Sequence, residues 1–291
     1  MNKEFNKGIL SATTGSLWWG ILGTYFFQYI SFVGSMEVVI HRTIWTSVIL
    51  FFTCLFFKKF YLVKKILLNR KNFLILFVTS ILIFGNWFTW IYAVATNKII
   101  DASYGYFIFP ILTIFLGYIF LNEKLNKKRI FSIVIIIIAS IFLLLNLTSF
   151  PWVGIIVALL WSTYNILRKL ISVETDIGLF IESLFILPIA LIIFYFIVIN
   201  GFNDFVMSKP KNMILLILAG PMTVIPLFLF IKGLEKSGLS ASSMIFFLTP
   251  TSQFLLGFFY YNEPFSTHKL ISFILIWIAV IIYLKDLYEK K

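Results

Sequence analysis

Apolar residues in this chain are gathered into ten long runs, separated by short polar segments. The runs cover residues 8–29, 36–57, 72–95, 101–121, 128–146, 151–170, 177–199, 211–233, 238–261 and 266–286. A helix of about 20 apolar residues crosses the hydrocarbon core of a bilayer. We therefore expect an all-α polytopic membrane protein with ten transmembrane helices.

Residues 103–141 match residues 243–281 without a gap, at a constant separation of 140 residues, and Pro110 and Pro250 are one of the identical pairs. With an odd number of helices in each half, the halves must enter the bilayer in opposite orientations. Inverted repeats of this kind are found in many secondary transporters, with the substrate site between them. We expect one five-helix repeat over residues 1–146 and a second, inverted one over residues 151–291.

Composition and charge agree with a membrane location. Hydrophobic residues make up 60% of the chain and charged residues only 12%, against about a quarter in soluble domains. The net charge is +12, but the basic residues lie in short loops, so we expect no nucleic-acid partner. Placing the N-terminus in the cytoplasm puts 19 Lys and Arg residues inside and 4 outside. This positive-inside distribution predicts that both termini are cytoplasmic.

The two equivalent prolines are candidate hinges. Each lies in the middle of a predicted helix and removes one backbone hydrogen bond, and paired helix breaks in the two halves point to a transport site. Ser103 and Ser243 lie two turns away and are candidate substrate-binding residues. The alternative is that Pro110 and Pro250 only shape packed helices.

Arg42 is the leading candidate for substrate binding. It lies one to two turns inside the second predicted helix, beside His41. A charged residue inside a membrane is tolerated where it faces water, a counter-charge or a ligand, and a guanidinium binds a carboxylate with two hydrogen bonds. Pairing with Glu37 or extension to the lipid headgroups are the alternatives for Arg42. His41 is a second candidate, with a structural role as the alternative.

Further polar and aromatic residues could form the walls of a cavity for a small amphipathic molecule. The candidates are Asn86, Trp90 and Tyr106 in the first half and Tyr164, Asn165 and Gln253 in the second. For each single aromatic residue, the alternative is a lipid-facing or interfacial position.

Glu37 lies at the start of the second predicted helix, and Glu182 lies about one turn inside the seventh. They are candidates for a gate or for coupling to protons, with helix caps or salt bridges to Arg168 and Lys169 as the alternative. The sequence has no P-loop, no dinucleotide-binding glycine motif, no HExxH and only two histidines. We therefore expect neither an enzyme nor a cofactor or metal site.

Several motifs resemble those of the drug/metabolite transporter superfamily, and within it the EamA-type RarD permeases. They are HRTIW at 41–45, GNWFTWIYAV at 85–94, ASYGYFIFP at 102–110 and LNEKL at 121–125. The resemblance spans nearly the whole chain. It implies a carrier in the bacterial inner membrane for a small metabolite, such as an amino acid or an aromatic compound.

These observations together predict a secondary transporter that moves a small organic molecule by alternating access. Its partners are the substrate and the lipid bilayer, and ten helices are sufficient for a monomer to form its own pathway, with a dimer as the alternative. A non-transporting membrane scaffold or receptor, and less so a membrane-embedded enzyme, are the competing interpretations.

Overall fold

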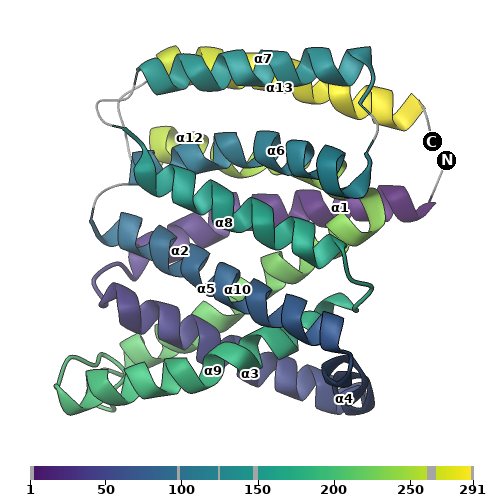
Figure 1. Ribbon diagram of the computed structural model, residues 1–291. Helices are drawn as coiled ribbons and strands as arrows, with labels where there is room; N and C mark the ends of the chain where they lie inside the picture. The colour runs from purple at the N-terminus through teal and green to yellow at the C-terminus, as the bar shows by residue number, and fades with distance from the viewer. Residues whose placement is uncertain (1–2, 97–98, 124, 147–149, 261–266, 290–291) are drawn as a thin grey trace.

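The computed structural model describes residues 3–96, 99–123, 125–146, 150–260 and 267–289, with the side chains of 94–95 and 99–103 left aside. All regular elements in these ranges are helices. They are α1 (Lys3–Leu17), the π-helix η1 (Trp18–Gly23), α2 (Thr24–Tyr29), α3 (Ser35–Phe56), α4 (Phe60–Leu68), α5 (Arg70–Ala95), α6 (Ile99–Leu121), α7 (Lys127–Leu145), α8 (Trp152–Lys169), α9 (Thr175–Ile199), α10 (Pro210–Ser237), α11 (Leu239–Ile245), α12 (Leu248–Phe259) and α13 (Thr267–Glu289). Figure 1 shows a stack of long helices, with α7 and α13 at one edge and α3 and α9 at the other.

Eight helical segments among the described residues are long and apolar enough to cross a membrane. They are α3, α5, α6, α7, α9, α10, α13 and the run that joins α11 to α12. Two further stretches pack among them: α1 lies along α10, and α8 lies against α5 and α6. Large apolar side chains such as Phe56, Leu145 and Phe259 are exposed on the outside of the bundle, as expected for a surface that contacts lipid.

The duplication seen in the sequence is also present in the helix boundaries. The starts of α3 and α9, α5 and α10, α6 and α11, and α7 and α13 are each 140 residues apart. Helices α7 and α13 pack antiparallel, because Lys128 lies 3.3 Å from Glu289 at one end and Phe142 packs against His268 at the other. Ring contacts show that α3 and α9 are antiparallel as well.

Two predicted helices differ in detail from the observed ones, and one short helix was not predicted. The first is continuous but contains the π-helix η1, and the ninth is divided into α11 and α12 at residues 246–247. The proline positions are not alike, because α6 continues through Pro110, whereas the break in the equivalent segment comes just before Pro250. The short helix α4 lies in a region where only a polar loop was expected.

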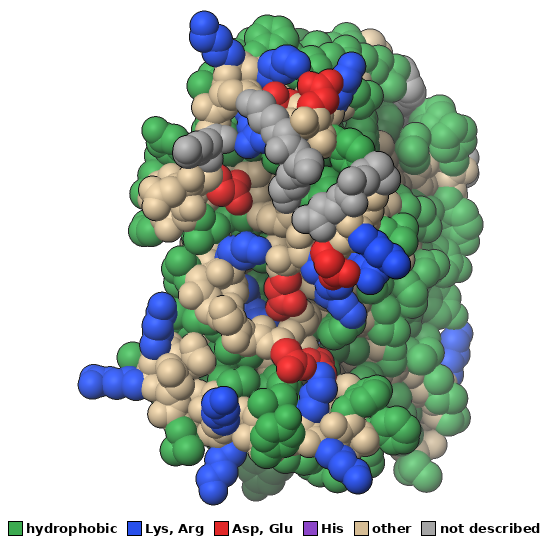
Figure 2. All heavy atoms as spheres, turned by 90° about the vertical axis from the view of Figure 1, so that its right-hand side faces the viewer, with side chains coloured by type: hydrophobic (Ala, Val, Ile, Leu, Met, Phe, Trp, Pro, Cys, Tyr) green, Lys and Arg blue, Asp and Glu red, His purple; other side chains and the backbone are tan. Residues whose placement is uncertain are grey.

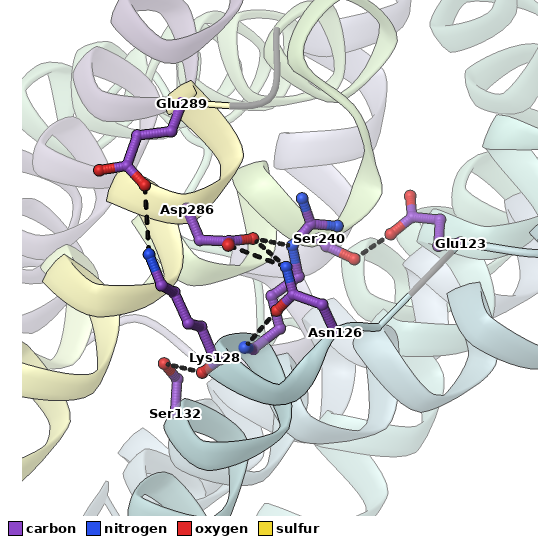
Figure 3. A network of polar contacts seen from close by, with 8 residues as sticks. Glu123, Asn126, Lys128, Ser132, Ser240, Asp286 and Glu289 are labelled. Carbon is purple, nitrogen blue, oxygen red and sulfur yellow. Dashed lines mark hydrogen bonds and ion pairs between the residues drawn. The ribbon is translucent and has the colours of Figure 1, made fainter.

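Charged side chains gather at the end of the bundle that carries both termini (Figure 2). Ion pairs join segments that are distant in the sequence, including Lys59 to Asp176 at 2.7 Å. Figure 3 shows the network at the ends of α7 and α13, where Asp286 accepts hydrogen bonds from Asn126 and Arg129. These contacts fix the ends of the helices relative to one another.

Candidate functional site

A cavity of about 60 Å³ lies in the middle of the bundle. Both halves of the chain contribute to it. Its walls are formed by Trp19, Gly23, Thr24, Phe27, Arg42, Ile83, Asn86, Trp87, Trp90, Tyr106, Trp161, Phe246, Thr249 and Gln253. A mainly aromatic cavity with a few converging polar groups is typical of a small-molecule site.

Arg42 is the charged group of this cavity and is only 5% exposed. Its guanidinium lies 4.5 Å from the ring centre of Phe27 and 4.9 Å from that of Trp87, and it is stabilised by both rings. Its Nε donates a hydrogen bond of 2.9 Å to the Thr223 hydroxyl, which in turn donates to the carbonyl of Ala219. These contacts fix the plane of the guanidinium.

No ion pair of Arg42 with a carboxylate occurs among the described residues, since the nearby acid Glu37 binds elsewhere. The Glu37 carboxylate accepts hydrogen bonds from the backbone N–H groups of Asp204 and Phe205, at 2.8 to 3.0 Å. It therefore holds the loop between α9 and α10. A buried guanidinium without a carboxylate partner is suited to an anionic ligand.

Aromatic rings make up the remaining walls. Trp19 packs edge-on against Trp161 at 5.6 Å, and Tyr106 packs edge-on against Phe246 at 5.5 Å. Such contacts hold the rings in defined orientations. The cavity therefore offers flat, rigid surfaces to a ligand.

Two side-chain amides reach the same cavity from opposite halves of the chain. Asn86 donates to the carbonyl of Val157 at 3.1 Å, and Gln253 donates to the Thr24 hydroxyl at 3.0 Å. The Gln253 Oε1 atom is buried and accepts no hydrogen bond from the described residues. This oxygen is available to a donor group on a ligand.

The π-helix brings the first segment close to α12. A side-chain Cβ at Gly20 would lie 2.7 Å from the Cβ of Ser252 and 2.8 Å from the carbonyl oxygen of Thr249, so only glycine fits there. The Thr249 hydroxyl donates to the Ser16 carbonyl at 3.0 Å. π-helical turns are frequent at functional sites, and this one places Trp19 and Thr24 in the wall of the cavity.

Five of the predicted substrate-binding residues therefore share one cavity: Arg42, Asn86, Trp90, Tyr106 and Gln253. The wall residues that were not among the predicted substrate-binding residues are Trp19, Gly23, Thr24, Phe27, Ile83, Trp87, Trp161, Phe246 and Thr249. The close spacing of Gly20 and Gly23 in the first apolar run was the available signal, because glycines mark close helix contacts in membranes.

The other predicted residues lie outside this cavity. His41 accepts a hydrogen bond from Trp45, packs on Phe194 and Phe205, and lies 3.9 Å from Glu37. Ser243 and Asn165 are buried and donate to backbone carbonyls of their own helices. Ser103 lies in α6, but its side chain is outside the described part of the structure.

Tyr164 and Glu182 belong to a second polar cluster. The Tyr164 hydroxyl donates to Glu182 at 3.1 Å, and the Thr79 hydroxyl donates to the same carboxylate at 2.6 Å. Arg168 lies 3.7 Å from Glu182, and both side chains are at most 3% exposed. The expected contact of Glu182 with Arg168 is thus present, whereas Lys169 donates to carbonyls at the end of α10.

No group of three or more His, Cys, Asp or Glu side chains that could hold a metal ion occurs within the described ranges. Cys54 is buried and unpaired. The chemistry of the central cavity is thus that of hydrogen bonding, charge and aromatic stacking.

A bundle of membrane-crossing helices around such a cavity defines a multi-span membrane protein. The chain belongs to the EamA-like transporter family, whose model matches it twice, at residues 6–145 and 150–285. The expected resemblance to this family is therefore confirmed, and the protein is assigned to transport.

Relatives cover almost the full chain. The sequence is 33% identical to an uncharacterized transporter of Vibrio cholerae, over 98% of this chain and 94% of that protein. It is 31% identical to the protein RarD of Escherichia coli, over 98% of this chain and 96% of that protein. It is also 31% identical to the uncharacterized transporter YojE of Bacillus subtilis, over 96% of this chain and 94% of that protein. A solved crystal structure with 14% sequence identity has the same fold, with a TM-score of 0.69 over 95% of this chain and 96% of the other.

Proposed function

We propose that this protein is a secondary transporter for a small organic molecule that carries a carboxylate, namely an amino acid or a related carboxylate or aromatic compound. The observation that carries this proposal is Arg42, a guanidinium buried in an aromatic cavity, for which the described part of the chain supplies no carboxylate partner. Its remaining N–H groups bind the substrate carboxylate. The rings of Trp19, Trp90 and Tyr106 enclose the rest of the molecule.

In this proposal the transporter works by alternating access of two inverted halves, which cross the bacterial inner membrane ten times. The antiparallel packing of equivalent helices supports inversion. The stretch from Lys3 to Tyr29 is 27 residues long, which at 1.5 Å per residue is about 40 Å and is enough to cross the bilayer. Residues around Pro110 and Pro250 act as the hinges between the outward-open and inward-open forms.

Counterflow in proteoliposomes tests the binding role of Arg42. Vesicles loaded with unlabelled amino acids and related carboxylates are expected to take up the labelled compound that fits the cavity. Arg42→Ala removes charged hydrogen bonds of about 1.5–3 kcal/mol, which corresponds to roughly 10- to 150-fold weaker binding. Arg42→Lys keeps the charge but loses the two-pronged geometry, and an intermediate loss is expected.

Arg70→Ala is the matched control, because Arg70 is an exposed arginine at the start of α5. It is expected to retain full exchange. Exchange by Arg42→Ala at the same rate as by Arg70→Ala would rule out the assigned site.

Cysteine labelling tests the orientation. The native Cys54 is fully buried, whereas Tyr61 in α4 and Met207 in the loop between α9 and α10 are 69% and 86% exposed. In intact cells, a membrane-impermeant maleimide is expected to label Met207→Cys but to label Tyr61→Cys only after permeabilisation. The reverse result would place both termini outside and contradict the proposed orientation.

A further inference from the structure

A second, smaller cavity lies beside the central one and contains a carboxylate. Its volume is about 20 Å³ and its lining is mainly apolar, with Glu182, Thr43, Thr46 and Ser183 as the polar residues. The Thr46 hydroxyl is buried and has no hydrogen-bond partner among the described residues. The space is sufficient for one water molecule, held by the polar groups of the lining.

Two routes connect Glu182 with the central cavity. Ile83 and Trp87 line both cavities, and Trp87 also lies over the guanidinium of Arg42. The second route is Tyr164, whose hydroxyl donates to Glu182 and whose ring stacks on Trp161 at 5.2 Å, with 8° between the planes. A change in the charge of Glu182 therefore acts on the walls of the central cavity through residues that contact both.

Arg168 is the charged partner of Glu182 and is incompletely satisfied. Its Nε lies 3.7 Å from the carboxylate, and none of its three nitrogens makes a hydrogen bond with the described residues. The guanidinium lies against Gly178, where a Cβ would come within 2.0 Å of Nη1. The pair is held in place by packing and charge and not by directed hydrogen bonds, so it can separate without breaking any.

The other groups around Glu182 are known from each helix packed against it. Thr79 of α5 and Tyr164 of α8 donate to it, and α3 contributes Thr43 and Thr46 across the small cavity. On the far side, Glu235 of α10 interacts electrostatically with Arg168. Arg168 thus has a second carboxylate within electrostatic reach if it loses the first.

In the repeat, Glu182 is the counterpart of Arg42. Helices α3 and α9 start at Ser35 and Thr175, so Arg42 and Glu182 occupy equivalent positions 140 residues apart. Because the two helices are antiparallel, the two charges lie toward opposite ends of the bundle. The duplicated scaffold presents a cation at one equivalent site and an anion at the other.

We propose that Glu182 is the proton-binding residue that couples transport to a proton gradient, an inference that rests on the proposed function. A hydronium ion in the small cavity gives its proton to a carboxylate oxygen of Glu182, which becomes a neutral carboxylic acid, and water is left. Arg168 then lacks its counter-charge and moves toward Glu235, which loosens α8 from α9. Loss of the proton restores the pair and closes this end of the bundle.

Proteoliposomes with an imposed pH gradient test the proposal, using a substrate that passes the counterflow assay. With one proton per substrate, wild type is expected to accumulate substrate about 10-fold for each pH unit, since one unit corresponds to a tenfold ratio. Glu182→Gln is expected to lose accumulation and to keep exchange. Glu174→Gln is the matched control: this glutamate precedes the same helix, lies outside the bundle and pairs with Lys59, and it should accumulate like wild type.

The outcomes separate the two proposals. Wild type without exchange of any substrate would overturn the transporter function itself, whereas exchange with accumulation by Glu182→Gln would overturn only the coupling role. Accumulation driven by sodium alone, or loss of exchange as well in folded Glu182→Gln, would also overturn the coupling role. If this variant does not fold, the test uses the wild-type protein in detergent with a pH-sensitive dye. Addition of substrate is then expected to cause proton uptake or release, and an unchanged dye signal would refute the proposal.

Discussion

Gly105 is the position where a single methyl group is expected to disturb the bundle most directly. Helices α6 and α8 cross there, and a Cβ at Gly105 would lie 2.2 Å from the carbonyl oxygen of Gly154. An ordinary contact begins at about 3.4 Å, so the helices must separate by about 1.2 Å. Small residues permit this approach in membrane proteins, and overpacking costs about 1–3 kcal/mol. Gly105→Ala is therefore expected to lower the free energy of unfolding by that amount.

Unfolding in mixed micelles with increasing SDS measures the effect, followed by tryptophan fluorescence. Gly85→Ala is the matched control, because Gly85 in α5 also faces α8 but a Cβ there would be 3.5 Å from Leu160. This contact is unstrained, and alanine is expected to be neutral or slightly stabilising. Equal stability of Gly105→Ala and Gly85→Ala would show that the close crossing of α6 and α8 is absent.

Two further predictions concern the charged end of the bundle. Asp286→Ala removes the acceptor of Asn126 and Arg129, and a loss of about 1.5–3 kcal/mol is expected in the same unfolding assay; unchanged stability would contradict the network of Figure 3. Hydrogen bonds from Lys236 and Lys7 lower the pKa of Glu4 to about 2. The stabilisation from this depressed carboxylate is present above pH 4.5 and is lost as the pH falls toward 2. Lys236→Ala is expected to raise the pKa of Glu4 toward 4.5, as measured by NMR titration, and an unchanged pKa would rule out the pair.

The helical fold could be predicted because membrane crossing imposes a length and a composition on each segment. Details of the helices that depend on packing could not be predicted from the sequence. The π-helix η1 depends on the contact of Gly20 with α12, and the division of α11 from α12 does not follow from Pro250 alone, since Pro110 leaves α6 unbroken. Helix α4 has nine residues and is therefore too short to be found by a search for apolar runs that cross a bilayer.

Part of the site was predictable for a different reason. Arg42 and Asn86 are polar residues inside apolar helices, and such residues are rare enough to indicate a site. Trp19 and Phe27 carry no such signal, because aromatic residues make up 19% of the chain. Tyr164 and Glu182 could be recognised as candidates, but the sequence does not show that they contact each other and Arg168 instead of the central cavity.

The repeat also explains why symmetry is a poor guide to the site. The residues 140 positions after Asn86, Trp90 and Tyr106 are Pro226, Phe230 and Phe246, which have no polar group to offer a ligand. Duplication supplies two equivalent frameworks, but a bound substrate needs only one set of polar contacts. Once one half provides these contacts, the equivalent positions are free to change, and in this chain Phe230 and Phe246 pack against Trp161. The polar contacts to substrate are therefore expected mainly from the first half, and the charged pair of Glu182 and Arg168 from the second.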